Sequence, residues 1–245
     1  MGIPRIYTEQ TLAQGQSLLL EAAPSHHILR VLRLRPEDPL VVFNGDGKEF
    51  SAALTGAEGR LARLEIGSAG EPRRESKLRI SLGQGVSRGE RMDMVMQKAV
   101  ELGVHTITPL WTKRSQVQLR GQRLEKRLAH WHGIVRAACE QSGRVRLPVL
   151  NHALELGDWL RSPFEDGGTG IMLDPDADIT LRELEPADNV RVLIGPEGGF
   201  DCEEVECADA AGYRRVRLGP RILRTETAAI ATLSALQTLW GDFAA

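Results

Sequence analysis

From Leu78 onward, short apolar runs alternate with longer segments of helical periodicity, and this alternation constrains the fold more than any other feature. Such alternation produces a mostly parallel sheet with helices on its faces. Ligands of these sheets bind beyond the carboxyl ends of the strands. The expected strands are 78–85, 105–110, 169–174, 190–195 and 213–218, and the expected helices are 89–102, 121–142, 153–161, 201–211 and 225–240.

The first 72 residues have a different pattern, of short strands and tight turns. The run LVVFNGDGKEFSAAL (40–54) places Asn-Gly-Asp-Gly between two apolar segments, which is a strong hairpin signal. Residues 60–68 alternate like a further strand, and residues 67–77 are rich in glycine, proline and charge, as linkers are. We therefore predict a small β-rich domain over 1–72 and an α/β domain over 73–245.

Charge is distributed unevenly along the chain, although the net charge is only −2. Residues 73–148 contain 16 basic and 6 acidic residues, a net of +10, whereas residues 149–245 contain 8 basic and 18 acidic residues, a net of −10. A basic block of this size is expected of a nucleic-acid-binding protein. A set of solvated helices, partly neutralised by the acidic third, explains it equally well from charge alone.

Composition also indicates in which cellular compartment the protein works and whether it binds a metal. No apolar stretch approaches the roughly 18 residues of a membrane span, and the sequence starts without a signal-peptide core. The three cysteines are odd in number and lack metal-type spacing, which favours a reduced, cytoplasmic setting. The six histidines form no ligand motif, so we expect no metal site.

The segment GQGVSRGERMD (83–93) nearly matches the dinucleotide-binding fingerprint. Its three glycines are spaced one position too long for GxGxxG, and Arg88 stands where a glycine is required. No acidic residue closes a second strand about 20 residues later, as ribose binding needs. We therefore exclude a nicotinamide cofactor. Arg88 and Arg91 lie at the expected strand–helix junction, where they either bind RNA phosphate or are simply solvated.

The segment VLIGPEGGFD (192–201) ends an apolar run with three glycines, after which acidic residues begin. A glycine-rich turn after a strand usually binds phosphate. Here, carboxylates at the start of the next helix compete with an anion for the helix N-terminus, and the Lys-Ser/Thr of a P-loop is missing. We therefore expect a ligand with little phosphate, held by the backbone.

The segment RLGPRILRTETAAIATLSALQTLW (217–240) joins an expected loop to a long helix, with Thr225 as the expected N-cap. Ile222 and Leu223 are apolar residues in that loop, flanked by two arginines. They fit either the apolar face of a ligand such as a purine ring or a buried anchor of the loop.

Several segments together resemble one family. IGPEGGF and LGPRILRTETAAIA are similar to the C-terminal signature of the SPOUT methyltransferases of the RsmE type, which are ribosomal RNA uridine-N3 methyltransferases. Five further segments agree in order and spacing, so the resemblance covers both halves of the chain: HHILRVLR (26–33), FNGDGKEFSA (43–52), ERMDMVMQKAVELGV (90–104), TKRSQV (112–117) and ACEQSGR (138–144).

This resemblance implies a fold and a cofactor. The fold would be a PUA-like, RNA-binding β-barrel over 1–72, followed by a SPOUT parallel sheet whose C-terminal segment is threaded into a trefoil knot. The cofactor would be S-adenosylmethionine, and its positive sulfonium tolerates the acidic residues near the glycine loop. The residues that the resemblance assigns to the cofactor pocket are Leu173, Gly195, Pro196, Glu197, Gly198, Gly199, Leu218, Gly219, Ile222, Leu223, Arg224 and Thr225.

The implied reaction is methyl transfer to N3 of a uridine in the decoding region of 16S ribosomal RNA. The N3 proton must leave, and a general base would contribute roughly 10²–10⁴-fold. Glu197 and Glu226 are the nearest carboxylates to the expected pocket, although Glu226 serves equally well to favour a helix N-terminus. Arg221 and Arg224 are candidates to stabilise a uracil anion.

The resemblance also implies partners. The target base must be unstacked, with the N-terminal domain gripping the RNA. We expect substitution of Arg114 to weaken RNA binding while cofactor affinity stays intact. Homodimers are implied, with helix 225–240 and Trp240 as the expected interface, unless that helix serves only the core of its own subunit. The expected RNA-binding residues are Arg30, Arg33, Arg88, Arg91, Lys113, Arg114 and Arg144.

Two other functions fit the same segments less well. One is a SPOUT enzyme that methylates the ribose 2′-oxygen or another base. The other is a ribosomal-RNA-binding assembly factor without catalysis, although such a protein would have no need of intact GPEGG and LGPRILRTET loops.

Overall fold

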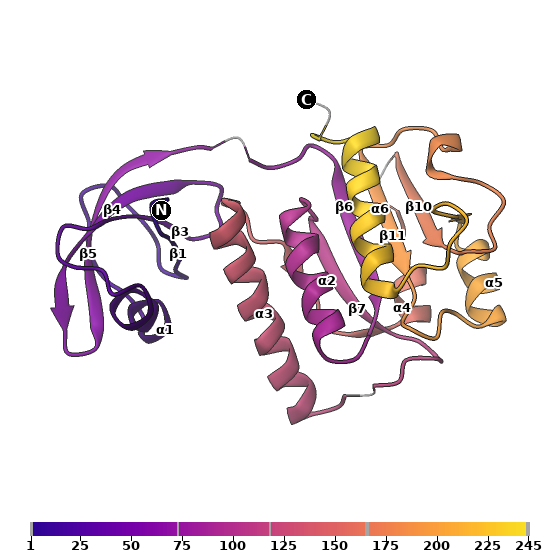
Figure 1. The fold of residues 1–245 in the computed structure, drawn as a ribbon, viewed down its shortest axis with the longest axis horizontal. Coiled ribbons are helices and arrows are strands. Elements are labelled where there is room, and N and C mark those ends of the chain that lie inside the picture. The colour runs from indigo at the N-terminus through magenta and orange to yellow at the C-terminus, as the bar shows by residue number, and fades with distance from the viewer. Residues whose placement is uncertain (1, 73, 118, 165–166, 244–245) are drawn as a thin grey trace. The chain divides into compact units, whose positions relative to one another are not determined.

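The computed structural model describes residues 2–72, 74–117, 119–164 and 167–243. The chain divides into two compact units (Figure 1). The first combines Met1–Glu75 with Cys139–Leu147, and the second combines Ser76–Ala138 with Pro148–Ala245. The first unit thus takes in a short segment from the middle of the chain, which a single cut after residue 72 does not anticipate.

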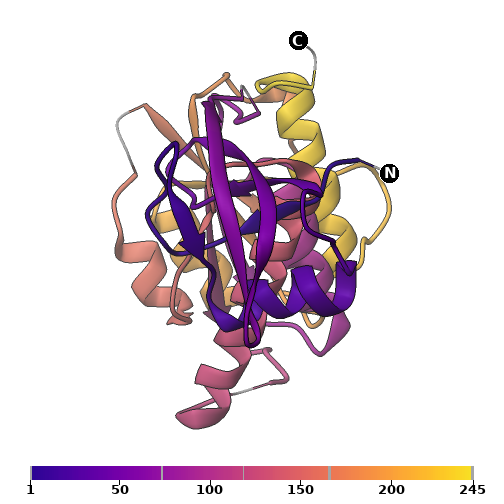
Figure 2. The ribbon, with the colours of Figure 1, turned by 90° about the vertical axis from the view of Figure 1, so that its left-hand side faces the viewer.

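The first unit, drawn in indigo to purple and facing the viewer in Figure 2, is built on a β-sheet. This sheet has five strands in the order β1-β3-β4-β5-β2. The expected hairpin is present, because β3 and β4 pair antiparallel around the Asn-Gly-Asp-Gly turn. Helix α1 (Ala22–His26) follows β2 in the chain and continues as the π-helix η1 (His27–Leu32). The strands are β1 (Arg5–Tyr7), β2 (Ser17–Leu19), β3 (Pro39–Phe43), β4 (Glu49–Glu58) and β5 (Leu61–Gly70).

Polar contacts hold residues 139–147 in the first unit. The Tyr7 amide donates to Glu140 Oε1 at 2.9 Å, and Arg144 Nη2 donates to Glu75 Oε2 at 2.8 Å. Arg144 is only 5% exposed. The expectation that Arg144 binds RNA is therefore wrong, because its guanidinium is buried and paired with Glu75.

The second unit contains a seven-stranded sheet whose order is β12-β10-β11-β6-β7-β8, with β9 beside β7. Every strand pair is parallel, as expected for strand–helix alternation. The strands are β6 (Arg79–Gly85), β7 (Thr106–Trp111), β8 (Val149–Leu150), β9 (Leu154–Glu155), β10 (Gly168–Leu173), β11 (Asn189–Ile194) and β12 (Tyr213–Val216).

Helices cover both faces of this sheet. Alternate residues of β11 belong to different core clusters: Val192 packs with α2, α3 and α6, whereas Leu193 packs with α4 and α5. Helix α4 starts three residues later than expected, because residues 154–155 pair with β7 instead. The helices are α2 (Glu90–Glu101), α3 (Gln122–Ser142), α4 (Leu156–Arg161), the 3-10 helix η2 (Leu181–Glu183), α5 (Cys202–Ala210) and α6 (Thr225–Leu239).

The described parts of the chain contain no helix that is both long and apolar enough to cross a membrane. The parallel sheet directs the carboxyl ends of its strands to one edge, where the loops before α2, α3, α5 and α6 begin. We call this edge of the second unit the carboxyl edge. The trefoil knot stays a prediction.

Candidate functional site

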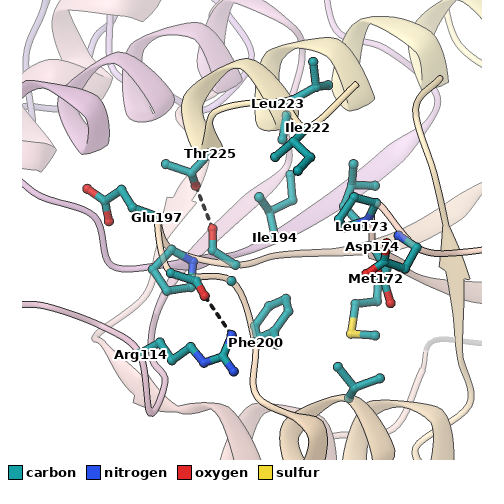
Figure 3. A pocket seen from close by; sticks show the side chains of 18 of the residues that line it. Arg114, Met172, Leu173, Asp174, Ile194, Glu197, Phe200, Ile222, Leu223 and Thr225 are labelled. Carbon is teal, nitrogen blue, oxygen red and sulfur yellow. Dashed lines mark hydrogen bonds between the residues drawn. The ribbon is translucent and has the colours of Figure 1, made fainter. Parts of the chain in front are cut away.

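A pocket of about 960 Å³ lies at the carboxyl edge (Figure 3). Its walls come from the ends of β10 and β11 and from the loops that lead into α5 and α6. On the β10 side, Asp174 is held by Arg215, whose Nη2 lies 2.7 Å from its carboxylate. All twelve residues expected to bind the cofactor line this one pocket. The structure therefore brings together residues from three separate parts of the sequence: 173, 195–199 and 218–225.

The loop after β11, residues 195–200, has its shape because of its glycines. Gly199 has φ of 66°, in the left-handed region that favours glycine. Its amide donates to the Pro196 carbonyl at 2.9 Å, which closes a turn. A Cβ added at Gly195 would lie 3.2 Å from the Gly199 Cα, so a side chain there would crowd the turn. We call residues 195–200 the glycine loop.

Side chains from two other segments fasten the glycine loop. Thr225 Oγ1 donates to the Gly195 carbonyl at 2.6 Å, and Arg114 Nη1 donates to the Gly198 carbonyl at 3.0 Å (Figure 3). Thr225 is the first residue of α6, and the N-cap is Arg224, which makes no side-chain capping bond. The expectation that Thr225 caps α6 is therefore wrong, because its hydroxyl is directed to the loop.

Gln84 and Gly85, at the end of β6, contact the glycine loop, and Gln84 also contacts the start of α6. Gln84 is fully buried, and its Nε2 donates to Thr225 Oγ1 at 2.9 Å and to the Gly195 carbonyl at 3.4 Å. A Cβ added at Gly85 would lie 2.5 Å from Pro196 Cδ, so only glycine allows the glycine loop to approach β6 this closely. The sequence pattern gave these residues no role, since it was compared only with a dinucleotide fingerprint.

Glu197 ties the glycine loop to the start of α2. Its Oε1 accepts hydrogen bonds from the Arg88 amide at 3.0 Å and from Arg91 Nη1 at 2.7 Å. Desolvation opposes its ionisation, but the bonds from the Arg88 amide, its own amide and Arg91 outweigh that effect and hold the pKa of Glu197 below its usual range. Glu197 is therefore a carboxylate at neutral pH, and one of its oxygens is already occupied.

The acidic residues that follow the glycine loop have structural partners. Asp201 and Glu204 form a capping box at the start of α5, in which each side chain accepts from the other residue's amide. The Lys113 ammonium lies 2.8 Å from Asp201 Oδ2 and also pairs with Glu203. The bond from Lys113, together with that from the Glu204 amide, lowers the pKa of Asp201. These carboxylates cap the N-terminus of α5 and hold residues 113–114 against it.

The loop before α6, residues 218–224, is held far less tightly, and we call it the arginine loop. Arg221 and Arg224 are exposed and line the pocket. Ile222 is 86% exposed, which is unusual for an isoleucine, whereas Leu223 is half-buried against the core. Of the two predicted roles, that of a buried anchor for the loop therefore fits Leu223 but not Ile222.

Glu226 lies in the first turn of α6 and lines the pocket. It is only 9% exposed, and its Oε2 has no hydrogen-bond partner in the part of the chain that the structure describes. A buried carboxylate oxygen without a partner is costly. Its position at the helix N-terminus offsets part of this cost, and a ligand donor in the pocket would offset more.

Comparison with known proteins identifies the family. The model of an RNA methyltransferase domain matches residues 74–237, and that of an RNA methyltransferase PUA domain matches residues 20–67. The ribosomal RNA small subunit methyltransferase E of Buchnera aphidicola is 38% identical over 98% of this chain and 98% of its own. This chain belongs to the ribosomal RNA small subunit methyltransferase E family. The predicted family, the SPOUT-type sheet with its PUA-like N-terminal domain, and the methyltransferase class are thereby confirmed.

Solved structures of this methyltransferase family support the same assignment. That of the enzyme from Neisseria gonorrhoeae bound to S-adenosyl methionine has a TM-score of 0.92 and 40% identity, covering 99% of this chain and 100% of the other. A Legionella pneumophila protein solved with bound SAM has a TM-score of 0.96 and 40% identity, with the same coverage. The relative from Bacillus subtilis is 28% identical over 94% of this chain and 93% of its own.

The residues expected to bind RNA in this methyltransferase lie in different settings. Arg91 and Arg114 line the pocket, Arg88 is exposed beside it, and Lys113 is paired with α5. Arg30 and Arg33 are exposed residues of the first unit. Because Arg114 also donates to the Gly198 carbonyl, its substitution should disturb the glycine loop as well. The expected separation of RNA affinity from cofactor affinity at Arg114 therefore no longer holds as a prediction.

The helix α6 packs largely within its own unit in this methyltransferase. Its buried face lies against α2, and Gln237 Nε2 donates to the Leu102 carbonyl at 2.9 Å. Trp240 packs partly buried against the same core. Packing within the subunit therefore accounts for this face, and a dimer would have to use the opposite, less buried face around Ala231 and Thr238.

Proposed function

We propose that the chain transfers a methyl group from S-adenosylmethionine to N3 of a uridine in 16S ribosomal RNA. The observation that carries this proposal is the convergence of the glycine loop, the arginine loop and a buried glutamate on one pocket at the carboxyl edge. Relatives named as small subunit ribosomal RNA methyltransferases cover nearly the whole of both chains. The proposed substrate follows from that likeness, and the proposed cofactor follows from likeness and pocket chemistry together.

The residues present fit the cofactor. A volume of about 960 Å³ lies within the range of small-molecule sites. Backbone of the glycine loop and apolar side chains such as Ile194 and Leu223 form walls suited to an adenine ring (Figure 3). Phosphate would meet the carboxylates at the start of α5, whereas a cation would not be repelled. When bound, S-adenosylmethionine supplies the methyl group on a positively charged sulfur.

Glu226 is the residue that we propose as the general base. Its carboxylate is buried at the pocket wall, and its Oε2 is free to accept the N3 proton of a uracil. Glu197 also has an Oε2 without a partner among the described residues, but it is less suited, since its Oε1 accepts from the Arg88 amide and Arg91, and these bonds hold its pKa below its usual range.

Arg221 and Arg224 would hold the uracil as its charge develops. Both line the pocket and are exposed, and no described carboxylate pairs with either guanidinium. Hydrogen bonds from arginine to the uracil oxygens would stabilise the N3 anion. We propose that these two residues position the base while Glu226 takes its proton.

The partners and location follow from the same proposal. The PUA-like unit would grip the RNA with exposed arginines such as Arg30 and Arg33. Two copies would pair through the less buried face of α6, and the enzyme would act in the cytoplasm on the ribosomal small subunit.

Methyl transfer tests the function directly. Labelled S-adenosylmethionine is incubated with the protein and either small ribosomal subunits lacking the modification or naked 16S RNA, and the nucleosides are analysed by mass spectrometry. We expect 3-methyluridine. A 2′-O-methylated nucleoside or another methylated base would replace the proposed reaction with that of a different RNA methyltransferase. Cofactor binding without any transfer would mean that the RNA substrate is wrong.

A further inference from the structure

The start of α3 carries a group of basic residues that the proposed reaction does not use. Residues 120–130 contain one acidic residue, Glu125. Four cations lie in the same stretch, and we call them the α3 ridge: Arg120, Arg123, Lys126 and Arg127.

Arg120 precedes the first residue of α3, and helical geometry places the other three members of the α3 ridge on one side of the helix. At about 100° per residue, Arg123, Lys126 and Arg127 fall within roughly a third of the helix circumference. Leu128 and Trp131 lie on a separate face, which is buried in the core of the second unit. The helix is therefore fixed by its apolar face and presents its cations to solvent.

The cations of the α3 ridge are largely unneutralised. Asp93 of α2 accepts from Trp131 Nε1 at 3.1 Å and from His130 at 2.9 Å, which fixes the orientation of α3. Arg127 lies 3.9 Å from the same carboxylate, at the limit of an ion pair. Among the described residues, no carboxylate pairs with Arg123 or Lys126, and both are exposed.

The α3 ridge lies at the same edge of the sheet as the pocket. β7 runs parallel to β6 and β11, so its carboxyl end, from which the chain leads to α3, is at the carboxyl edge. Figure 1 shows the first turns of α2, α3 and α6 at this one end, with α3 extending furthest. The segment between β7 and α3 also contains Arg114, which lines the pocket. A bound polyanion could therefore contact both places.

We propose that the α3 ridge binds the phosphate backbone of the RNA that flanks the target nucleotide. The inference rests on the proposed function, because it takes RNA as the substrate. Exposed cations such as Arg123 and Lys126, at the same edge of the sheet as a site that receives one unstacked base, would supply affinity without reading sequence. The α3 ridge sets the position of the strand, and the pocket selects the base.

Matched charge variants test the proposal. R123Q/K126Q removes one arginine and one lysine from the α3 ridge. K77Q/R214Q removes the same two residue types from exposed positions outside the carboxyl edge, Lys77 before β6 and Arg214 within β12. Binding of each folded protein to a 16S RNA fragment containing the target uridine is measured across a salt series. Cofactor affinity is measured alongside.

We expect R123Q/K126Q to bind the RNA about tenfold more weakly at moderate salt, with a salt slope that is smaller by about one to two. Cofactor affinity should not change, and K77Q/R214Q should bind RNA like the unaltered protein. Equal RNA affinity and slope for the two double variants would overturn the proposal. An equal loss in both would also overturn it, because it would mean diffuse attraction.

The two proposals fail in different ways. If the unaltered protein makes no 3-methyluridine but R123Q/K126Q still loses RNA affinity selectively, the proposed reaction fails and the α3 ridge stands. If 3-methyluridine forms at equal rate and subsaturating RNA with both double variants, the reaction stands and the α3 ridge does not bind substrate.

Discussion

The two loops that form the pocket are held in opposite ways. Thr225, Arg114 and Gln84 each donate to a backbone carbonyl of the glycine loop, and Glu197 ties that loop to α2. In the arginine loop, Arg221, Ile222 and Arg224 are exposed.

This difference separates two tasks. A loop held by several hydrogen bonds from other segments is preorganised, so it loses little entropy when a ligand binds. Exposed cations and an exposed isoleucine contribute most to the free energy of binding when a second molecule covers them. The glycine loop is therefore the fixed half of the pocket, and we expect the arginine loop to be completed by RNA or by a second subunit.

The largest effect should come from Glu226, which follows the arginine loop. E226Q keeps the shape of the side chain and removes the base, so kcat should fall by roughly 10²–10⁴-fold. Cofactor affinity, measured by calorimetry, should change little. E206Q is a matched control, since Glu206 also lines the pocket but is exposed on α5. A normal kcat in E226Q would mean that Glu226 is not the general base and serves only to stabilise the N-terminus of α6.

Gln84 tests the fixed half of the pocket. Q84A removes its bonds to Gly195 and Thr225, so the loop should loosen and the cofactor Kd should rise about tenfold, equivalent to about 1.4 kcal/mol. Q237A is the matched control, because Gln237 is an equally buried glutamine that bonds to Leu102 and Ser76, away from the pocket. If both variants lose stability but neither loses cofactor affinity, Gln84 does not position the pocket.

Glu197 should give the smallest effect, and it should depend on pH. Its pKa is lowered by folding, so its ionised form stabilises the protein above the unfolded pKa of about 4.3, and this contribution is lost as pH falls through the folded pKa. E197Q should therefore cost about 1 kcal/mol at pH 7 and less near pH 3.5. Urea unfolding at both pH values measures this. A cost that does not shrink in acid would mean that Glu197 acts through packing alone.

The fold of the second unit was predictable from its sequence because periodicity and apolar runs report local burial. The five expected strands are present, and most helix bounds agree within one or two residues. Helix α4 is an exception, because Leu154 and Glu155 pair with a strand that lies far away in the chain. Pairing of this kind depends on tertiary contacts that no local pattern contains.

The members of the pocket were predictable through the family resemblance, whereas their partners were not. The link from Glu197 to Arg91 and the links from Gln84 to Gly195 and Thr225 each span more than a hundred residues of sequence. For Arg144 the sequence suggested a role that the structure does not support. Its charge predicted RNA binding, but its guanidinium is buried and paired with Glu75. Charge is visible in a sequence, but which carboxylate neutralises it is decided by the fold.

The segment Cys139–Leu147 has a consequence for how the chain is made. The first unit includes this segment, so it cannot be completed when Glu75 leaves the ribosome. Some 70 further residues must be synthesised, which takes about 4–14 s at roughly 5–20 residues per second. During that interval Glu75 lacks Arg144, and the Tyr7 amide lacks Glu140. The N-terminal unit is thus the first to be synthesised, yet it must wait for a helix of its neighbour to be translated before its native contacts can close.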